Sequence, residues 1–165
     1  MTMSWDVDVR HLFVSAEHNY RGRHGKGSLS HPIEDREVIE CVARRGIRGD
    51  RYFDHKEDFK GQVTFFEDEV YGAMKEKFGL PALEPSAFRR NVIIRGVPLN
   101  ELIGRRFTLQ GLEFEGVEEA KPCYWMDEAC ADGAEEFLKG KGGLRARIRT
   151  GGKLRHGQGS LELLP

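Results

Sequence analysis

The segment Leu144-Arg145-Ala146-Arg147-Ile148-Arg149 carries the clearest strand pattern in the sequence and points to a sheet-based fold. Apolar residues at every second position predict one buried face, and the arginines between them predict a polar face. Gly151-Gly152 follows directly and predicts a tight hairpin turn. Residues 160–164 are then expected to close the sheet.

Several other short segments show strand patterns bounded by turn residues, at 6–15, 37–44, 62–66, 89–95, 107–109 and 112–117. Gln110-Gly111 separates the last two, which are expected to pair with each other. The sequence shows no regular alternation of long apolar strands with helices, so a doubly wound parallel fold is not expected.

Two helices are predicted outside the sheet. Residues 67–78 have an acidic start, which suits the helix dipole, and Val70 and Met74 share one apolar face. A second helix is predicted after Cys123 and is weakened in its middle by Asp132-Gly133. The expected fold is therefore mainly β: a curled, mostly antiparallel β-barrel-like domain with two or so peripheral helices.

The composition is that of a soluble globular protein. The chain has 165 residues and is expected to form one domain, residues 1–165, with 39% hydrophobic and 32% charged residues. Its start lacks a signal-peptide pattern and no apolar run could span a bilayer, so a cytoplasmic location with no membrane partner is expected. Three cysteines without a disulfide framework fit a reducing compartment.

Charge is distributed unevenly along the chain. The net charge is only −1, which argues against a nucleic-acid partner because nucleic-acid binders are usually basic. Residues 139–156, however, contain seven lysines and arginines and no acid, directly after an acidic segment. A small anion is the expected partner of this local positive charge.

Cys123 is the residue most suggestive of chemistry. It lies between a predicted strand end and a predicted helix start, and Lys121 is close by. Both features lower the pKa of a thiol, and a thiolate is a nucleophile and a ligand for soft metals. The alternative is a small buried apolar residue, which free cysteines usually are. Cys41 and Cys130 lack cationic neighbours and are expected to fill the core.

The arginine strand has two interpretations. Alternation places Arg145, Arg147 and Arg149 on one face, where three like charges repel one another unless an anion compensates them. Alternatively, this face is solvated and pairs with the acidic strand that contains Glu113 and Glu115, where the charges contribute little.

Other polar clusters are less specific. The cationic turns Arg48-Gly49-Asp50-Arg51 and Arg89-Arg90-Asn91 are weak anion-site candidates that could converge with the arginine strand on one pocket. His18, His24 and His31 share one loop, but their spacing matches no ligand pair of a zinc enzyme, and a flexible basic lid is expected there.

Taken in order, several segments resemble the molybdenum cofactor sulfurase C-terminal (MOSC) domain family. They are Gly46-Ile47-Arg48-Gly49-Asp50-Arg51, Arg89-Arg90-Asn91-Val92-Ile93-Ile94, Leu102-Ile103-Gly104 with Phe107, Lys121-Pro122-Cys123, and Gly142-Gly143-Leu144-Arg145-Ala146 running to Gly151-Gly152. Together they span nearly the whole chain.

The resemblance implies a β-barrel-like domain that binds molybdenum cofactor (molybdopterin), a pterin dithiolene bearing a phosphate. In that family the cysteine after proline, which matches Cys123, is the proposed metal ligand or sulfur carrier. The residues expected to hold the cofactor are Arg48, Gly49, Asp50, Arg51, Arg89, Arg90, Asn91, Lys121, Arg145, Arg147 and Arg149.

Three functions are expected, the first two implied by the family resemblance and the third by the cationic residues alone. The first is an oxidoreductase that reduces N-hydroxylated small compounds, with Cys123 binding molybdenum. Because the sequence contains no ferredoxin-type cysteine cluster, its electrons are expected from a partner protein. The second is a sulfur carrier or cofactor-delivery module in which Cys123 bears a persulfide. The third is a non-catalytic barrel that binds anions or single-stranded nucleic acid.

Overall fold

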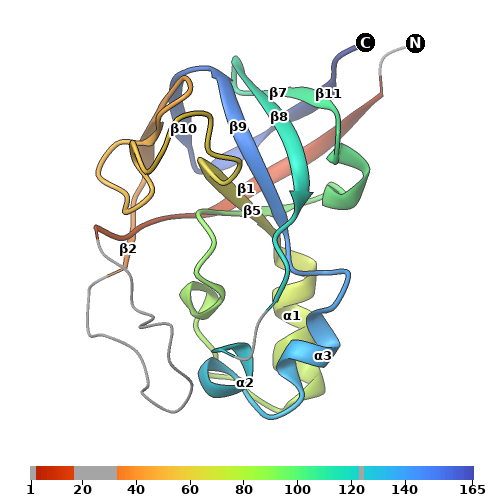
Figure 1. Ribbon diagram of the computed structural model, residues 1–165. Coiled ribbons are helices and arrows are strands. Elements are labelled where there is room, and N and C mark those ends of the chain that lie inside the picture. Colours follow the sequence, from red (N-terminus) through yellow and green to blue (C-terminus); the bar gives the residue numbers. More distant parts are fainter. Residues whose placement is uncertain (1–2, 17–32, 123–124) are drawn as a thin grey trace.

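The computed structural model describes residues 3–16, 33–122 and 125–165. Within these residues, seven strands close a barrel in the order β11-β7-β8-β9-β5-β6-β1, and β1 pairs with β11 to complete it (Figure 1). Their bounds are β1 (Ser4–Val14), β5 (Val63–Glu67), β6 (Val92–Arg95), β7 (Arg106–Leu109), β8 (Leu112–Glu119), β9 (Leu144–Thr150) and β11 (Gly157–Leu163). Only β5 and β6 among them pair in parallel, so the prediction of a mostly antiparallel barrel is confirmed.

Four short strands lie outside the barrel wall. They are β2 (Glu34–Asp35), which pairs antiparallel with the end of β1, and a separate sheet of β10 (Gly152–Arg155), β3 (Val38–Val42) and β4 (Gly46–Ile47). The hairpin predicted at Gly151-Gly152 is wrong, because β10 pairs with β3 and not with β9. Near the end of β9, β8 occupies one edge, and on the other Ile148 donates its N–H to the Gln62 side-chain oxygen and accepts from the Arg44 N–H, so its backbone groups are not available to a hairpin partner.

The helices gather at one end of the barrel, below it in Figure 1. They are α1 (Asp68–Lys77), α2 (Trp125–Ala129) and α3 (Ala134–Leu138), with the 3₁₀ turn η1 (Pro85–Phe88). A second 3₁₀ turn, η2 (Leu99–Leu102), packs against the barrel strand β8 instead. The predicted second helix is thus divided into α2 and α3, because Gly133 adopts a left-handed conformation, with φ of 93°, at the start of α3. No helix in the described ranges is both long and apolar enough to cross a membrane.

Two hydrophobic cores share the strands β5 and β6. Phe65 points into the barrel, where its ring lies 5.7 Å from Phe107 and 5.4 Å from Phe114. The next residue, Phe66, points to the helical side and stacks on Phe88 at 4.4 Å. Because successive side chains of a strand face opposite sides, one strand contributes to both cores.

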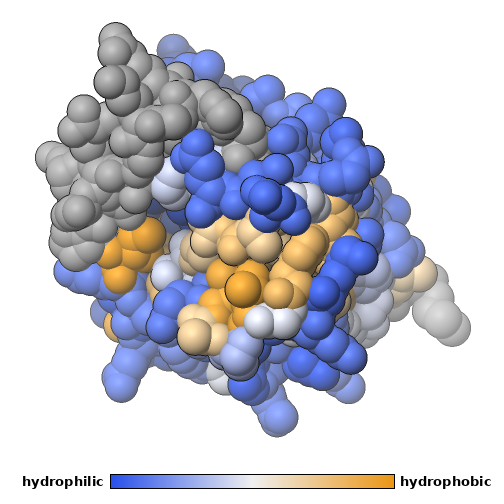
Figure 2. Space-filling view, turned by 90° about the horizontal axis from the view of Figure 1, so that it is seen from below, coloured by the Kyte–Doolittle hydropathy of each residue, from blue (hydrophilic) through white to orange (hydrophobic). Residues whose placement is uncertain are grey.

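The outer face of the helical end is apolar at its centre and hydrophilic around it (Figure 2). This face carries a groove of about 520 Å³, lined mainly by residues 79–87 between α1 and η1. Ala129, the last residue of α2, and Cys130 directly after it complete the lining.

Gly116 lies at a very close backbone crossing in the barrel wall. A β-carbon at this position would lie 2.1 Å from the backbone oxygen of Leu102. The Gly116 N–H donates to the Arg105 oxygen at 2.9 Å, and its own oxygen accepts from Gly104 at 2.8 Å. The turn after η2 therefore lies directly on β8, at a distance that only glycine allows.

Replacing Gly116 by alanine is expected to lower the free energy of unfolding by about 2 kcal/mol, because the added methyl group must push the Leu102 backbone away. Urea denaturation measures this change. Gly159→Ala is the control, since Gly159 lies in β11 with open space at its β-carbon position. Equal stability of the two variants would contradict the close crossing.

Candidate anion-binding site

A cavity of about 210 Å³ lies between one end of the barrel and the helical layer. Its lining comes from the loop before β5, from β5 and β9, from the segments after η1 and β8, and from α2. The residues are Arg51, Tyr52, Phe59, Gly61, Thr64, Arg89, Arg90, Ala120, Lys121, Pro122, Met126 and Arg145. These twelve residues include five cations and no carboxylate, so the cavity attracts anions.

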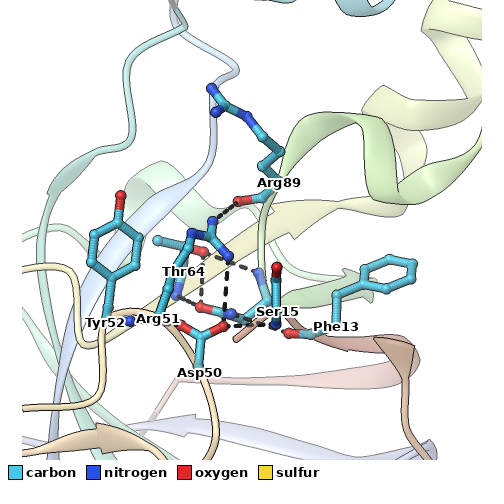
Figure 3. A network of polar contacts seen from close by, with 8 residues as sticks. Phe13, Ser15, Asp50, Arg51, Tyr52, Thr64 and Arg89 are labelled. Carbon is cyan, nitrogen blue, oxygen red and sulfur yellow. Dashed lines mark hydrogen bonds and ion pairs between the residues drawn. The ribbon is translucent and has the colours of Figure 1, made fainter. Parts of the chain in front are cut away.

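Asp50 is buried beneath the cavity and positions Arg51 (Figure 3). Its carboxylate accepts hydrogen bonds from the backbone N–H groups of Ser15 at 3.1 Å and Tyr52 at 3.2 Å. The same carboxylate lies 3.6 Å from Nη1 of Arg51, while Nη2 of Arg51 donates to the backbone oxygen of Arg89 at 3.4 Å. Asp50 therefore acts on the site through Arg51, which lines the cavity.

Arg89 adopts a left-handed backbone conformation, with φ of 56° and ψ of 40°, at the end of η1. Such a conformation costs a residue with a β-carbon about 1 kcal/mol, and it concentrates at functional sites. Its guanidinium lies 5.1 Å from the ring centre of Trp125, the first residue of α2. The strained backbone thus places a cation on the cavity wall, between barrel and helices.

The side chains of Arg90 and Asn91 both form hydrogen bonds with backbone groups of other segments. The Arg90 guanidinium donates to three backbone oxygens, those of Phe88, Ala120 and Gly142. Asn91 is buried; its side-chain oxygen accepts from the Thr64 N–H at 3.0 Å, and its amide donates to the Phe13 oxygen at 3.1 Å. Asn91 therefore joins β1, β5 and β6, and it does not line the cavity.

The three arginines of β9 have different surroundings. Arg145 lines the cavity, and its nearest carboxylate contact, with Glu118, is long at 4.0 Å. Arg147 and Arg149 lie outside the lining and both contact Glu115 on the adjacent β8, at 3.3 and 2.7 Å. Burial raises the pKa of Glu115, but hydrogen bonds from these two arginines outweigh it and leave the pKa lowered. The contacts of Arg147 and Arg149 with Glu115 confirm, for these two arginines, the alternative interpretation of pairing with the acidic strand.

Arg48 and Gly49 also lie outside the lining. Nε of Arg48 donates to Glu40 at 3.0 Å, and its guanidinium lies over the ring of Phe53. Gly49 has φ of 89° and supplies the turn that leads to Asp50. The structure therefore brings Arg51, Arg89, Arg90, Lys121 and Arg145 of the predicted residues together around one cavity.

Cys123 and Tyr124 lie outside the described residues, whereas the two residues before them and Trp125 after them are described. Lys121 and Pro122 precede Cys123, and all three of Lys121, Pro122 and Met126 line the cavity. The other two cysteines are poor thiolates. Burial raises the pKa of Cys41 to about 12 and that of Cys130 to about 11.

The aromatic wall of the cavity was not predicted from the sequence. Tyr52 and Phe59 line it with ring centres 5.3 Å apart, and His55 packs on both. The Arg51 guanidinium lies 4.9 Å from the Tyr52 ring. The only signal in the sequence was four ring-bearing residues in the polar segment 52–59, and their spacing follows neither a helical nor a strand period. The aromatic wall suits the planar part of a ligand, and the neighbouring cations suit an anionic group on the same ligand.

The family model of the MOSC domain matches residues 47–159 of this sequence. The chain belongs to the MOSC domain family. This match confirms the resemblance found in the sequence, and it covers the three clusters Arg48-Gly49-Asp50-Arg51, Arg89-Arg90-Asn91 and Lys121-Pro122-Cys123. No curated protein matches the sequence significantly.

Solved structures share the fold of this MOSC domain. The YuaD protein from Bacillus subtilis superposes with a TM-score of 0.73 at 17% identity, over 99% of this chain and 98% of YuaD. YiiM from Geobacillus stearothermophilus gives 0.69 at 14% identity, over 96% of this chain and 75% of YiiM. YiiM from Escherichia coli gives 0.65 at 18% identity, over 99% of this chain and 70% of YiiM. At these identities the likeness shows the fold.

Arg145→Gln is expected to weaken binding of inorganic phosphate about tenfold, because it removes a charged donor from the cavity. NMR titration with phosphate measures the affinity. Arg147→Gln is the matched control, since it lies two residues along the same strand but contacts Glu115 and Asp58 outside the cavity. Equal loss in both variants would show that the cavity does not select the anion.

Arg89→Gly is expected to be about 1 kcal/mol more stable than Arg89→Ala, because only glycine relieves the left-handed backbone. Both variants should lose phosphate affinity equally. Arg44, with φ of 68°, provides the control: its glycine and alanine variants should differ in stability in the same way without changing phosphate binding. Chemical denaturation and the same titration measure both quantities. An alanine variant as stable as the glycine variant would show that Arg89 is not strained.

Proposed function

We propose that this MOSC domain binds molybdenum cofactor and reduces N-hydroxylated small compounds, with Cys123 as the metal ligand. The observation that carries the proposal is the position of Lys121 and Pro122. These two residues directly precede Cys123 in the sequence, and both line the cationic cavity. Membership of the MOSC family supports the choice of cofactor.

The described lining fits the chemistry of this cofactor. Arg89, Lys121 and Arg145 would hold its phosphate, since guanidinium and ammonium groups bind phosphate by charge-assisted hydrogen bonds. Tyr52 and Phe59 would pack against its planar pterin. A soft thiolate at Cys123 suits molybdenum, and nearby positive charge keeps a thiol ionised.

Each part of the chain has a separate task in the reaction. Reduction of R–NH–OH breaks the N–O bond, takes up two electrons and two protons, and releases R–NH₂ and water. When bound, the cofactor supplies the two-electron chemistry. The cations orient the anionic ligand, and the aromatic wall with Met126 excludes water from one side of the cavity. An electron-donor protein in the cytoplasm would supply the electrons.

Cys123→Ala is expected to abolish molybdenum binding without unfolding the domain, because it removes the metal ligand and keeps the barrel. Protein purified from a host that makes the cofactor is analysed for molybdenum per chain. Cys130→Ala is the matched control, since Cys130 is half-buried and lies outside the cavity lining; it should retain the metal.

Molybdenum retained in Cys123→Ala would refute the role of Cys123. A mass increase of one sulfur on Cys123, with metal but without reductase turnover, would favour the sulfur-carrier function. Salt-dependent binding of single-stranded nucleic acid by protein that never acquires cofactor would favour the non-catalytic barrel.

A further inference from the structure

We infer that Glu118 guards the cavity against free small anions: its carboxylate competes with an incoming anion for the guanidinium of Arg145, and Lys60 limits this competition. The inference rests on the cationic cavity binding an anion, as the proposed function requires, and on neither the metal nor its ligand. Glu118 is outside the cavity lining, so it acts through Arg145, which is part of the lining.

Glu118 lies in one row of the barrel with two residues of the cavity lining. Arg145 of β9 is opposite Thr64 of β5 on one side and opposite Glu118 of β8 on the other. Residues directly opposite each other in antiparallel strands have side chains on the same face of the sheet. Because Thr64 and Arg145 both line the cavity, the Glu118 carboxylate lies on the face that carries it.

A β-bulge in β8 brings this carboxylate opposite Arg145. Gly116 is paired with Ala146, so a regular ladder would place the apolar Val117 opposite Arg145. The register instead shifts between Gly116 and Glu118, and Glu118 becomes the partner of Arg145. Bulges re-aim side chains and concentrate next to functional sites. The ladder therefore breaks at the point where its break pairs an acid with a cation of the cavity.

The Glu118 carboxylate is shared by two cations. Its Oε1 lies 2.7 Å from Nζ of Lys60 and 4.0 Å from Nε of Arg145. A hydrogen bond from Lys60 lowers the pKa of Glu118, the charges of Lys60 and Arg145 lower it further, and together they outweigh the slight burial that raises it. Glu118 is therefore negatively charged at neutral pH and is a counterion for both cations.

The contact of Glu118 with Arg145 is longer than the equivalent contact elsewhere on β9. Glu115 lies 2.7 Å from Arg149, outside the cavity lining, whereas the Glu118 carboxylate is drawn toward Lys60. A carboxylate beside Arg145 repels an incoming anion and attracts the guanidinium that the anion needs. This lowers the affinity for every anion that uses Arg145 by a similar factor. A free small anion then binds weakly, while an anion on a planar body still gains contact with the aromatic wall.

NMR titration of the full-length protein with inorganic phosphate tests the inference. The titration is done at about 0.15 M salt, where exposed charges more than about 8 Å apart are largely screened. Glu118→Gln keeps the shape of the side chain and removes its charge, so it should strengthen phosphate binding about fivefold. Unchanged or weaker binding would overturn the inference.

Glu115→Gln is the matched control for net charge. It removes the same charge from the same strand, but Glu115 pairs with Arg147 and Arg149, which lie outside the cavity lining. Phosphate binding should stay nearly unchanged in this variant. Equal strengthening in Glu115→Gln and Glu118→Gln would show a general charge effect and would overturn the inference.

A double-mutant cycle tests whether Glu118 acts through Arg145. In the Arg145→Gln background, Glu118→Gln should change phosphate binding by less than about twofold, because the guanidinium for which Glu118 competes is absent. The same gain with and without Arg145 would contradict the competition.

Lys60→Gln tests the second cation. Without Lys60, the Glu118 carboxylate can move closer to Arg145, so phosphate binding should weaken about threefold. In the Glu118→Gln background the same substitution should have a smaller effect, because no carboxylate remains to be released. Equal weakening in the two backgrounds would show that Lys60 acts by its own charge and would contradict the role assigned to it.

Failure of this inference is distinguishable from failure of the proposed function. Absence of molybdenum from the wild-type protein would refute the cofactor proposal and leave the phosphate series unaffected. Unchanged phosphate affinity in Glu118→Gln, with molybdenum still bound by the wild type, would refute the role of Glu118 alone.

Discussion

The parallel pairing of β5 with β6 is the constraint on which the cavity depends. Parallel neighbours need a long crossover, and here the crossover contains α1 and η1. It returns the chain to the barrel at Arg89-Arg90-Asn91, beside Thr64 at the start of β5. β9 begins and β8 ends at this same end of the barrel. Cations from four distant parts of the sequence, at positions 51, 89–90, 121 and 145, therefore meet there.

Local patterns predicted most of the barrel but not its connections. The alternation in residues 144–149 and the Gln110-Gly111 turn correspond to β9 and to the β7–β8 hairpin. The glycine pair at 151–152 misled, because two glycines permit a hairpin as readily as a close approach. A β-carbon on Gly151 would lie 2.6 Å from the Cys41 oxygen, a contact that depends on the tertiary structure alone.

The candidate site was predictable by residue type more than by role. Positive charge near strand ends indicated Arg51, Arg89, Lys121 and Arg145, which do line one cavity. Single-sequence patterns do not distinguish an arginine that faces a cavity from one that holds backbone, because both follow from contacts far along the chain. The aromatic wall of Tyr52 and Phe59 lies in an irregular loop, where no period exists to predict it.

One wall of the cavity is formed by barrel strands and the opposite wall by a helix. Strands β5 and β9 belong to a closed hydrogen-bonded barrel, whereas Met126 comes from α2, a helix of only five residues. Helices this short depend on tertiary contacts, and α2 has them: Trp125 and Met126 are both buried in the core on the helical side. The two sides of the cavity are therefore fixed by different forces, backbone hydrogen bonds between strands on one side and apolar packing of side chains on the other.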